Sequence, residues 1–480
     1  MNKIIITFLI SALIGKSNVC IAQIDTVTFN LQATHLFPSF PVKSSYTSLF
    51  DKRPGMNYLY SANMESGLGI YDISVPNAIT PVLNFTIGNF NNLDVSTIEQ
   101  IGNSLFVGIG DFQVNSNTSS GLAVLDITNP TKPSVKDIWN SPAFHHGISH
   151  LIIEGNYAYL STMSDGIIIL DISDENNIIF KSSLQLDLNY PAPSANAHNA
   201  RGLKYKNDTL YVCFDRGGLR VVDVTNKIKP VEVYKYINST LNSQAAAAYN
   251  DIAIKGNYAF VSVDYCGLEV IDISSVPFTS VQWINPWGCT NSNWSGADLH
   301  TNELALANND SILFVTGGQS ELFAYDVTNP NTIKKLGEFV NLNDTLATHG
   351  LDVLNNKVSL SFIHTPFHIP PFTPFFADPG GLKLLEFNIS TLNNSLFELD
   401  NNEESILIFP NPNSGNNINI KSNSAITKIM ITNSIGELLY SANKIHKTEH
   451  TLTLESQETG MFFINIITTK GQTTKKIIIN

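Results

Sequence analysis

The sequence predicts an all-β protein: a seven-bladed β-propeller with about four antiparallel strands per blade, followed by a small C-terminal β-sandwich. The propeller is predicted by a short phrase of the type Leu-Asp-Ile-Ser, which recurs along most of the 480 residues. The aspartates of its six clear copies are Asp72, Asp126, Asp171, Asp223, Asp272 and Asp326, which lie 54, 45, 52, 49 and 54 residues apart. A degraded seventh copy contains Glu386. A period of about 40 to 60 residues indicates equivalent units that bury their apolar faces against one another.

Each repeat has the residues of a four-stranded sheet. A β-rich run such as 156–161 is followed by a polar loop, a second run such as 167–172 and a proline-containing turn such as Asn129-Pro130. An open β-solenoid is the alternative, but solenoid coils are usually shorter than this period. In a closed ring, either segment 26–31 or segment 395–399 is expected to supply the outer strand of the last blade.

The recurrent aspartate has a structural interpretation. It stands where a strand ends and a turn begins, and aspartate side chains at such positions accept hydrogen bonds from the backbone two residues later. We therefore expect these aspartates to stabilise turns rather than bind a ligand.

Composition narrows the classes of partner. The net charge is -13 and the chain has four arginines, so it has no basic stripe that could release counterions from phosphates. Nucleic acid and an anionic membrane surface are therefore not expected as partners. The hydrophobic content of 43% is sufficient for a packed core.

Residues 1–23 have the features of an export signal. Lys3 precedes an apolar stretch over residues 4–15, and small residues near Ala22 offer a cleavage point. Cys20 also permits a lipoprotein interpretation, which its neighbouring residues fit poorly. No later segment is long and apolar enough to cross a bilayer, so we expect an exported product without a transmembrane segment.

The cysteines are expected to reach an oxidising compartment. Cys266 and Cys289 fall in segments at the same end of the repeat array, which predicts a disulfide between them. Cys213 lies within a strand and is expected to be free and buried.

Two copies carry a resemblance to a known repeat. The segments "LYVCFDRGGLRVVDVTNKIKPVEV" and "AFVSVDYCGLEVIDISSVPFTSV" resemble LVIVD repeats. The resemblance covers roughly residues 45–400, within a propeller domain that we place at residues 24–400. It implies an exported protein with a propeller fold, and it implies no particular reaction because the family has no general assigned activity.

The C-terminal segment has a different sequence pattern from the repeats. After a linker at residues 401–404, residues 405–480 form a compact series of short strands that resembles the type A C-terminal sorting domain of the type IX secretion system. The matching landmarks, in order, are Pro410, Asn411, Pro412, Gly436, Gly460, Lys475 and Lys476. Glu437 departs from the pattern, since a basic residue commonly follows this glycine. The resemblance implies the type IX machinery as a partner and a location outside the cell or on its surface; the alternative is an ordinary β-sandwich that binds a ligand.

The candidate site is a set of polar residues near the start of the first strand in several repeats. In a propeller these positions converge around the central channel. The set expected to bind a ligand is His146, His198, Arg201, Asn250, Asp251, His300, Glu303, His349 and Asp352. Its four histidines could together coordinate a transition metal, although they could also be structural residues copied with the repeat.

Other segments could join this site. Loops between second and third strands add the polar residues Asp165, Asp215, Arg216, Asp264 and Tyr265, and the insertion 364–381 adds Phe367, Phe372, Phe375 and Phe376. That insertion could act as a binding lid or fill the channel. Trp283, Trp287 and Trp294 could stack on a sugar ring or pack in the core.

Sequence motifs do not indicate an enzyme. No hydrolase elbow, phosphate loop, zinc-protease helix or spaced carboxylate pair is present. The first hypothesis is therefore a secreted or surface-attached recognition propeller that binds a glycan, a protein or another extracellular ligand. The second is a metal-dependent exported enzyme that uses the same histidine-bearing face.

Overall fold

The structure is a computed structural model with two compact units, residues 1–392 and 393–480. Residues described here are 24–38, 44–110, 119–192, 198–242, 248–285, 301–318, 321–340, 346–366, 376–377, 379–391, 406–413, 417–433, 437–453 and 459–479. The predicted signal peptide lies outside the described residues. No helix in these ranges is long and apolar enough to span a membrane.

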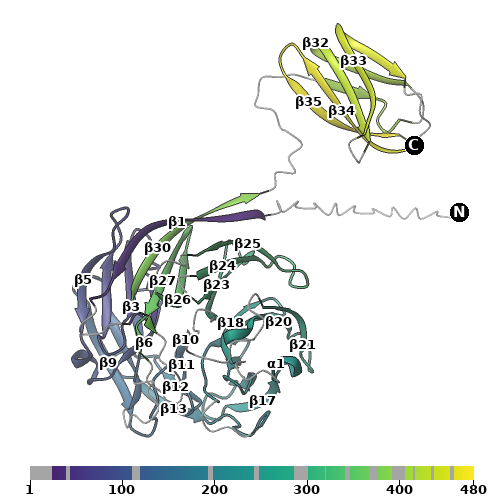
Figure 1. The fold of residues 1–480 in the computed structure, drawn as a ribbon. Helices are drawn as coiled ribbons and strands as arrows, with labels where there is room; N and C mark the ends of the chain where they lie inside the picture. Colours follow the sequence, from purple (N-terminus) through teal and green to yellow (C-terminus); the bar gives the residue numbers. More distant parts are fainter. Residues whose placement is uncertain are drawn as a thin grey trace, which may run out of the picture. The chain divides into compact units, whose positions relative to one another are not determined.

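The first unit consists of four-stranded antiparallel sheets (Figure 1). Six of them follow the chain: β2(Thr47–Phe50) to β5(Thr80–Phe85), β6(Val95–Ile101) to β9(Ser134–Ser141), β10(His150–Glu154) to β13(Ile179–Leu184), β14(Leu203–Lys206) to β17(Val231–Tyr236), β18(Tyr249–Lys255) to β21(Thr279–Ile284), and β22(Thr301–Ala307) to β25(Lys334–Phe339). The strands inside these sheets are β3(Tyr58–Ala62), β4(Leu68–Asp72), β7(Ser104–Ile109), β8(Ser120–Asp126), β11(Tyr157–Ser161), β12(Ile167–Asp171), β15(Thr209–Cys213), β16(Leu219–Asp223), β19(Tyr258–Val263), β20(Gly267–Asp272), β23(Ile312–Gly317) and β24(Glu321–Asp326).

A further sheet joins the two ends of the unit. It has the order β26(Ala347–Leu354), β27(Lys357–Ile363), β30(Gly381–Thr391), β1(Ile24–Leu36). The expected N-terminal outer strand is therefore confirmed, because β1 pairs with β30 over its whole length. The competing segment 395–399 lies outside the described residues.

The sheets form a closed ring. The first strand of each sheet contacts the first strand of the next, in the order β2, β6, β10, β14, β18, β22, β26 and back to β2. Apolar side chains fill the space between neighbouring sheets; one core cluster joins Leu219 of one sheet to Ile252 and Val261 of the next. This confirms the all-β propeller class. The number of blades stays a prediction for the whole chain, because these sheets are those of its described part.

The recurrent aspartates stabilise turns, as predicted. In each clear copy the carboxylate accepts a hydrogen bond from the backbone N–H two residues later, over 2.7–2.9 Å. Hydrogen bonds of this kind lower the pKa of Asp72. The main cause is the pair of hydrogen bonds that its carboxylate accepts from the side chain and the backbone of Ser74.

Antiparallel connectivity gives the propeller two distinct faces. First strands begin, and second strands turn into third strands, at what we call the mouth face. First strands turn into second strands at the opposite end, which we call the hairpin face. In the described part of the chain, three short helices lie outside the sheets: Ile87–Phe90, Ser239–Asn242 and Asp264–Cys266.

The second unit is the predicted compact β-domain. Its strands are β31(Ile406–Phe409), β32(Asn417–Asn433), β33(Leu438–Thr453), β34(Gly460–Thr468) and β35(Gln472–Ile479). β32 pairs with β31, β33 and β34, and its register shifts between Lys421 and Ile426. β32 and β33 are thus longer than the short strands expected there, and the alternating isoleucines of β32 belong to one buried core.

Candidate functional site

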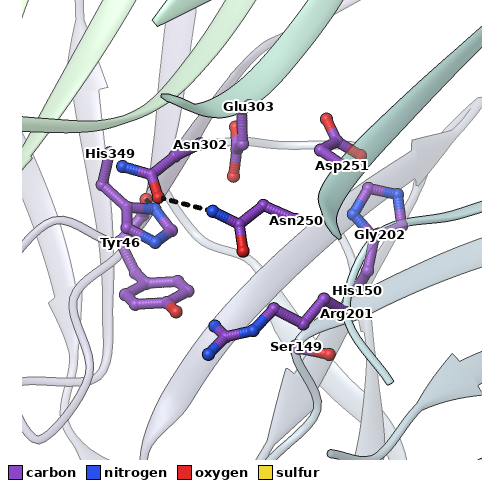
Figure 2. Close-up of a pocket in the computed structure, with 10 residues that line it drawn as sticks. All are labelled: Tyr46, Ser149, His150, Arg201, Gly202, Asn250, Asp251, Asn302, Glu303 and His349. Carbon is purple, nitrogen blue, oxygen red and sulfur yellow. Dashed lines mark hydrogen bonds between the residues drawn. The ribbon is translucent and has the colours of Figure 1, made fainter. Parts of the chain in front are cut away.

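Polar residues from several sheets meet on the mouth side of the propeller axis (Figure 2). We call this space the axial pocket; its lining residues are Tyr46, Ser149, His150, Arg201, Gly202, Asn250, Asp251, Asn302, Glu303 and His349. Five of the nine residues predicted to bind a ligand are among them: Arg201, Asn250, Asp251, Glu303 and His349. These five residues therefore lie close together, and ligand binding by them stays a prediction.

The axial pocket is small. Its volume is about 30 Å³, far below the roughly 150 Å³ of a cavity that holds benzene. A sugar ring therefore does not fit inside it, and among the described residues a larger ligand can contact only its rim.

Several lining side chains link one sheet to the next. Ser149 Oγ donates to Ala200 O over 2.6 Å, Asn250 Nδ2 to Thr301 O over 2.9 Å, and Asn302 Nδ2 to Thr348 O over 3.2 Å. In each case the acceptor directly precedes the lining residue of the following sheet. These side chains satisfy backbone groups that antiparallel pairing within a sheet leaves unused.

Three predicted acidic residues have the same role. Asp251 Oδ2 accepts from Leu304 N over 2.9 Å, and Glu303 Oε2 accepts from Leu351 N over 2.9 Å. Asp352 lies outside the axial pocket, where its Oδ2 accepts from the backbone N–H of Phe50 over 2.8 Å. All three carboxyl groups therefore bind the backbone of the next sheet.

Burial raises the pKa of two of these acids. It raises the pKa of Glu303 well above its usual value, and the negative charge of Asp251 adds to this effect. Burial likewise raises the pKa of Asp352 to about 6, although Lys52 opposes the shift. The shifts follow from structural enclosure, so they do not by themselves indicate an acid–base catalyst.

Arg201 provides the cationic group of the axial pocket. Its Nε donates to Asp215 Oδ1. The other oxygen of this carboxylate, Asp215 Oδ2, accepts from Asn199 Nδ2 over 2.6 Å. The arginine side chain extends toward Tyr46, which comes from a different sheet (Figure 2). Burial raises the pKa of Tyr46, and the charge of Arg201 opposes this effect. The pairing with Asp215 largely neutralises Arg201.

The three predicted histidines that the structure describes do not lie together. His349 lines the axial pocket; its Nδ1 is 2.9 Å from Tyr46 O and its ring lies 3.8 Å from the Tyr46 ring. His146 contacts Ser164 Oγ at 3.0 Å and is not among the lining residues. His198 is buried, with Nδ1 2.9 Å from Leu188 O, and burial lowers its pKa. His300 lies outside the described residues.

The physical reason is the place of each histidine relative to the start of its first strand. The axis is approached by Ser149 and Arg201, three positions after His146 and His198, whereas His349 itself occupies this position. A register shift near the start of the first strand occurs in early and late repeats alike, in β6, β18, β22 and β26, so it does not separate His349 from the other two histidines. Within the described ranges no group of three or more His, Cys, Asp or Glu residues could hold a metal ion. Metal binding thus stays a prediction without a described ligand set.

Sequence reasoning missed Tyr46, His150 and Asn302. Tyr46 precedes the first repeat phrase, and His150 is the first residue of β10. Asn302 lies next to Glu303, and the alternation of side chains along a strand hid its approach to the axis. Asn302 directly precedes Glu303, whose carboxylate binds the backbone of the next sheet. This position before the acidic residue is the sequence signal that would have identified Asn302.

The mouth loops differ in exposure. Asp215, Asp264 and Tyr265 are buried. Asp165 Oδ2 accepts from the backbone N–H of His145 over 2.6 Å. Arg216 is exposed, and it makes no ion pair with another described residue. Among these loop residues, Arg216 is thus the charged group most available to a ligand.

The remaining predicted features are partly covered by the structure. Cys266 is disulfide-bonded, while its predicted partner Cys289 lies outside the described residues. Cys213 is free and buried, as expected. Trp283 Nε1 donates to Cys266 O over 2.6 Å; Trp287 and Trp294 are outside the described residues. So are Phe367, Phe372 and Phe375 of the insertion, where β28(Thr365–Pro366) pairs with β29(Phe376–Ala377).

The landmarks of the tail come together at one end of their sheet. Asn411, between Pro410 and Pro412, donates from Nδ2 to Lys476 O over 3.0 Å and accepts at Oδ1 from Ile478 N over 2.9 Å. The two motifs are 65 residues apart in sequence and are joined by this side chain. Gly460 begins β34 with a positive φ of 144°, Lys475 lies beside Lys476 in β35, and Gly436 lies outside the described residues.

Comparison with known families decides the identity of both units. Residues 116–141, 149–185, 198–238 and 248–277 match the LVIVD repeat, and residues 407–480 match the secretion system C-terminal sorting domain. The chain carries LVIVD repeats and a secretion sorting domain. The sorting domain directs type IX secretion, so the LVIVD-repeat propeller is exported to the cell surface or beyond it. No curated protein is significantly similar to this chain.

Solved structures similar to the chain include propellers. The WD40 β-propeller domain of Doa1 has a TM-score of 0.50 and 9% identity, over 75% of this chain and 97% of that domain. A chain of the mitotic checkpoint complex reaches 0.48 at 10% identity, over 75% and 96%, and the designed protein Ika8 reaches 0.43 at 11%, over 74% and 100%. At this identity the Doa1 likeness establishes the fold alone.

Proposed function

We propose that this LVIVD-repeat propeller is an exported recognition protein that binds an extracellular glycan or protein on its mouth face. The observation that carries the proposal is the small size of the axial pocket. Because its volume of about 30 Å³ is far below that of a cavity that holds a six-membered ring, ligand contacts fall on the surrounding loops. A rigid ring that presents loops from many sheets is suited to recognition over a broad surface.

Arg216 is the side chain that we assign to first contact. It is exposed at the mouth, next to the neutralised Arg201–Asp215 pair, in a chain whose net charge is -13. Its guanidinium can bind a carboxylate or sulfate group in two-pronged fashion. His145 is a second exposed side chain on the same face.

The test is binding of the labelled mature protein to a glycan array and to intact cell-surface polysaccharides. The Arg216→Ala and His145→Ala double variant should lose at least tenfold in affinity for the best ligand. Lys132→Ala is the matched control, because it removes an exposed cation from the hairpin face. Unchanged binding by the double variant, or equal loss in the control, would refute recognition at the mouth face.

A further inference from the structure

A second cavity lies on the hairpin face, away from the mouth. It has a volume of about 270 Å³ and is lined by Asn308, Asn355, Asn356, Phe387, Asn388 and Ile389. We call it the asparagine groove. β26 begins beside the axial-pocket residue His349 and ends at Leu354, directly before Asn355. At about 3.3 Å per residue the two sites are therefore separated by roughly 20 Å.

The polar lining of the groove is neutral. Asn356 Nδ2 donates to Glu386 Oε1 over 2.6 Å and Asn308 Nδ2 donates to Ser311 Oγ over 2.8 Å. These bonds fix both amides so that each carbonyl oxygen stays available as an acceptor. The side chains of Asn355 and Asn388 form no hydrogen bond to another described residue, so each offers a donor and an acceptor. No charged residue is among the lining residues, which favours an uncharged, hydroxyl-rich ligand.

An open strand edge adds a backbone donor and acceptor. The pairing of β27 with β30 ends at Lys357 and Glu386, and Phe387 N then donates to Asn356 O over 2.8 Å. Backbone groups in a strand point to alternate edges, so the N–H and C=O of Ile389 face the same edge as Phe387 N. No described strand pairs with that edge at Ile389.

The groove also has an apolar floor. Phe387 is 4% exposed and packs edge-on against Phe314, with ring centroids 5.0 Å apart. It is held in place by the core and therefore adds rigid apolar surface beneath the amides. A cavity of about 150 Å³ accommodates benzene, so the asparagine groove accommodates one six-membered ring with its substituents.

We propose that the asparagine groove binds a terminal 2-acetamido sugar. The acetamido group carries one N–H and one C=O, as a peptide does, and can pair with the free edge at Ile389. Its methyl group and the apolar side of the ring lie against Phe387 and Ile389, while the ring hydroxyls bond to the asparagine amides. This site is distinct from the mouth face and does not depend on the function proposed there.

The probe is methyl N-acetylglucosaminide, with methyl glucoside as its counterpart without the acetamido group. Titration of the mature full-length protein, followed by ligand-observed NMR, should give a Kd of about 1 mM for the acetamido sugar, as expected for a small exposed groove. The glucoside should bind at least tenfold more weakly. Asn388→Ala and Asn355→Asp should each weaken binding at least fivefold. Asn355 has a φ of 56°, which aspartate tolerates, so the second variant preserves the turn.

Asn207→Asp is the matched control, because Asn207 occupies the corresponding hairpin turn of another sheet with a φ of 51°. It should bind the sugar normally, and so should the mouth variant Arg216→Ala. Equal binding of the two glycosides, normal binding by both groove variants, or occupation of the Ile389 edge by an extended peptide in place of the sugar would overturn the proposal. If Arg216→Ala loses binding to the glycan array while the groove variants keep it, that result bears on the function proposed for the mouth face and not on the asparagine groove.

Discussion

At the scale of single residues, the acidic side chains near the axis are structural. Asp251, Glu303 and Asp352 each accept a backbone N–H from the following sheet. A buried carboxyl group in this role satisfies a donor that would otherwise lack a partner. In the sequence, such a structural acid looks the same as a catalytic acid, because either would be an acidic residue near the start of the first strand of a repeat.

Asp352 should make stability depend on pH. Burial raises its pKa to about 6, from 3.8, with Lys52 and Glu99 the nearby charges. The folded state thus binds more protons than the unfolded state between these values, and the free energy of unfolding should fall as pH rises from about 4 to 6, by at most about 3 kcal/mol. Asp352→Asn retains an acceptor for Phe50 N and should flatten this dependence.

Urea midpoints measured between pH 4 and 7 check the effect. Asp310→Asn, at an exposed hairpin position, should leave the pH dependence unchanged. An Asp352→Asn profile parallel to that of the parent protein would show that Asp352 does not titrate in this range.

The turn aspartates make a second prediction at this scale. Asp72 Oδ1 accepts from Ser74 N over 2.7 Å, so Asp72→Ala should lower the free energy of unfolding by about 1 kcal/mol. Asp72→Asn keeps an acceptor that can form the same turn and should lose less than half as much. Chemical denaturation measures both. Equal losses in the two variants would mean that the charge, and not the hydrogen bond, stabilises the turn.

At the scale of elements, β1 closes the ring through its pairing with β30 and its packing beside β25. Gly337 of β25 permits this contact: a Cβ at position 337 would lie 1.9 Å from Val27 O. The glycine is needed for the close approach of two backbones rather than for a turn.

Gly337→Ala should therefore destabilise the propeller by about 1–3 kcal/mol, because β1 or β25 has to shift. Gly88→Ala is the control, since the atom nearest to its added Cβ is Thr86 Oγ at 3.5 Å. Thermal unfolding of both variants, together with limited proteolysis of the N-terminal strand, checks the prediction. A Gly337→Ala protein as stable as Gly88→Ala would show that β1 yields to the added methyl without cost.

Most of the propeller could be predicted from the sequence because strand pattern and turn chemistry recur together. The phrase around Asp171, for example, marks the end of a third strand in register with its relatives. The site could be predicted only as a region. Matching His146 with His349 misaligned the two repeats: His349 lines the axial pocket, whereas in the earlier repeat Ser149 does so, three positions after His146, which lies beside Ser164. The asparagine groove was missed because its residues come from hairpin turns of two sheets and from a strand edge.

At the scale of the whole molecule, the chain divides into a propeller and a sorting domain, each with its own core. Neither core includes residues of the other unit. Binding and export are thus assigned to separate folding units, which allows each to be tested without the other.

Deletion of residues 405–480 should leave the propeller folded but prevent its passage through the outer membrane, because the sorting domain is the export signal for that step. Cell fractionation should find the truncated protein in the periplasm, with the thermal midpoint of its propeller within about 2 °C of the full-length value. The intact chain, expressed from the same promoter, is the control. Truncated protein in the medium at the level of the intact chain would refute this role of the tail.

Closure by β1 also determines the order in which the sheets of the propeller can be completed during folding. β1 leaves the ribosome more than 340 residues before its partner β30, since Thr28 pairs with Asn388. Contacts between such distant segments make folding slow, and until they form the last sheet lacks its outermost strand. A chain interrupted before β30 cannot complete the circle. Fragments produced by premature termination should therefore be cleaved by proteases more readily than the intact chain.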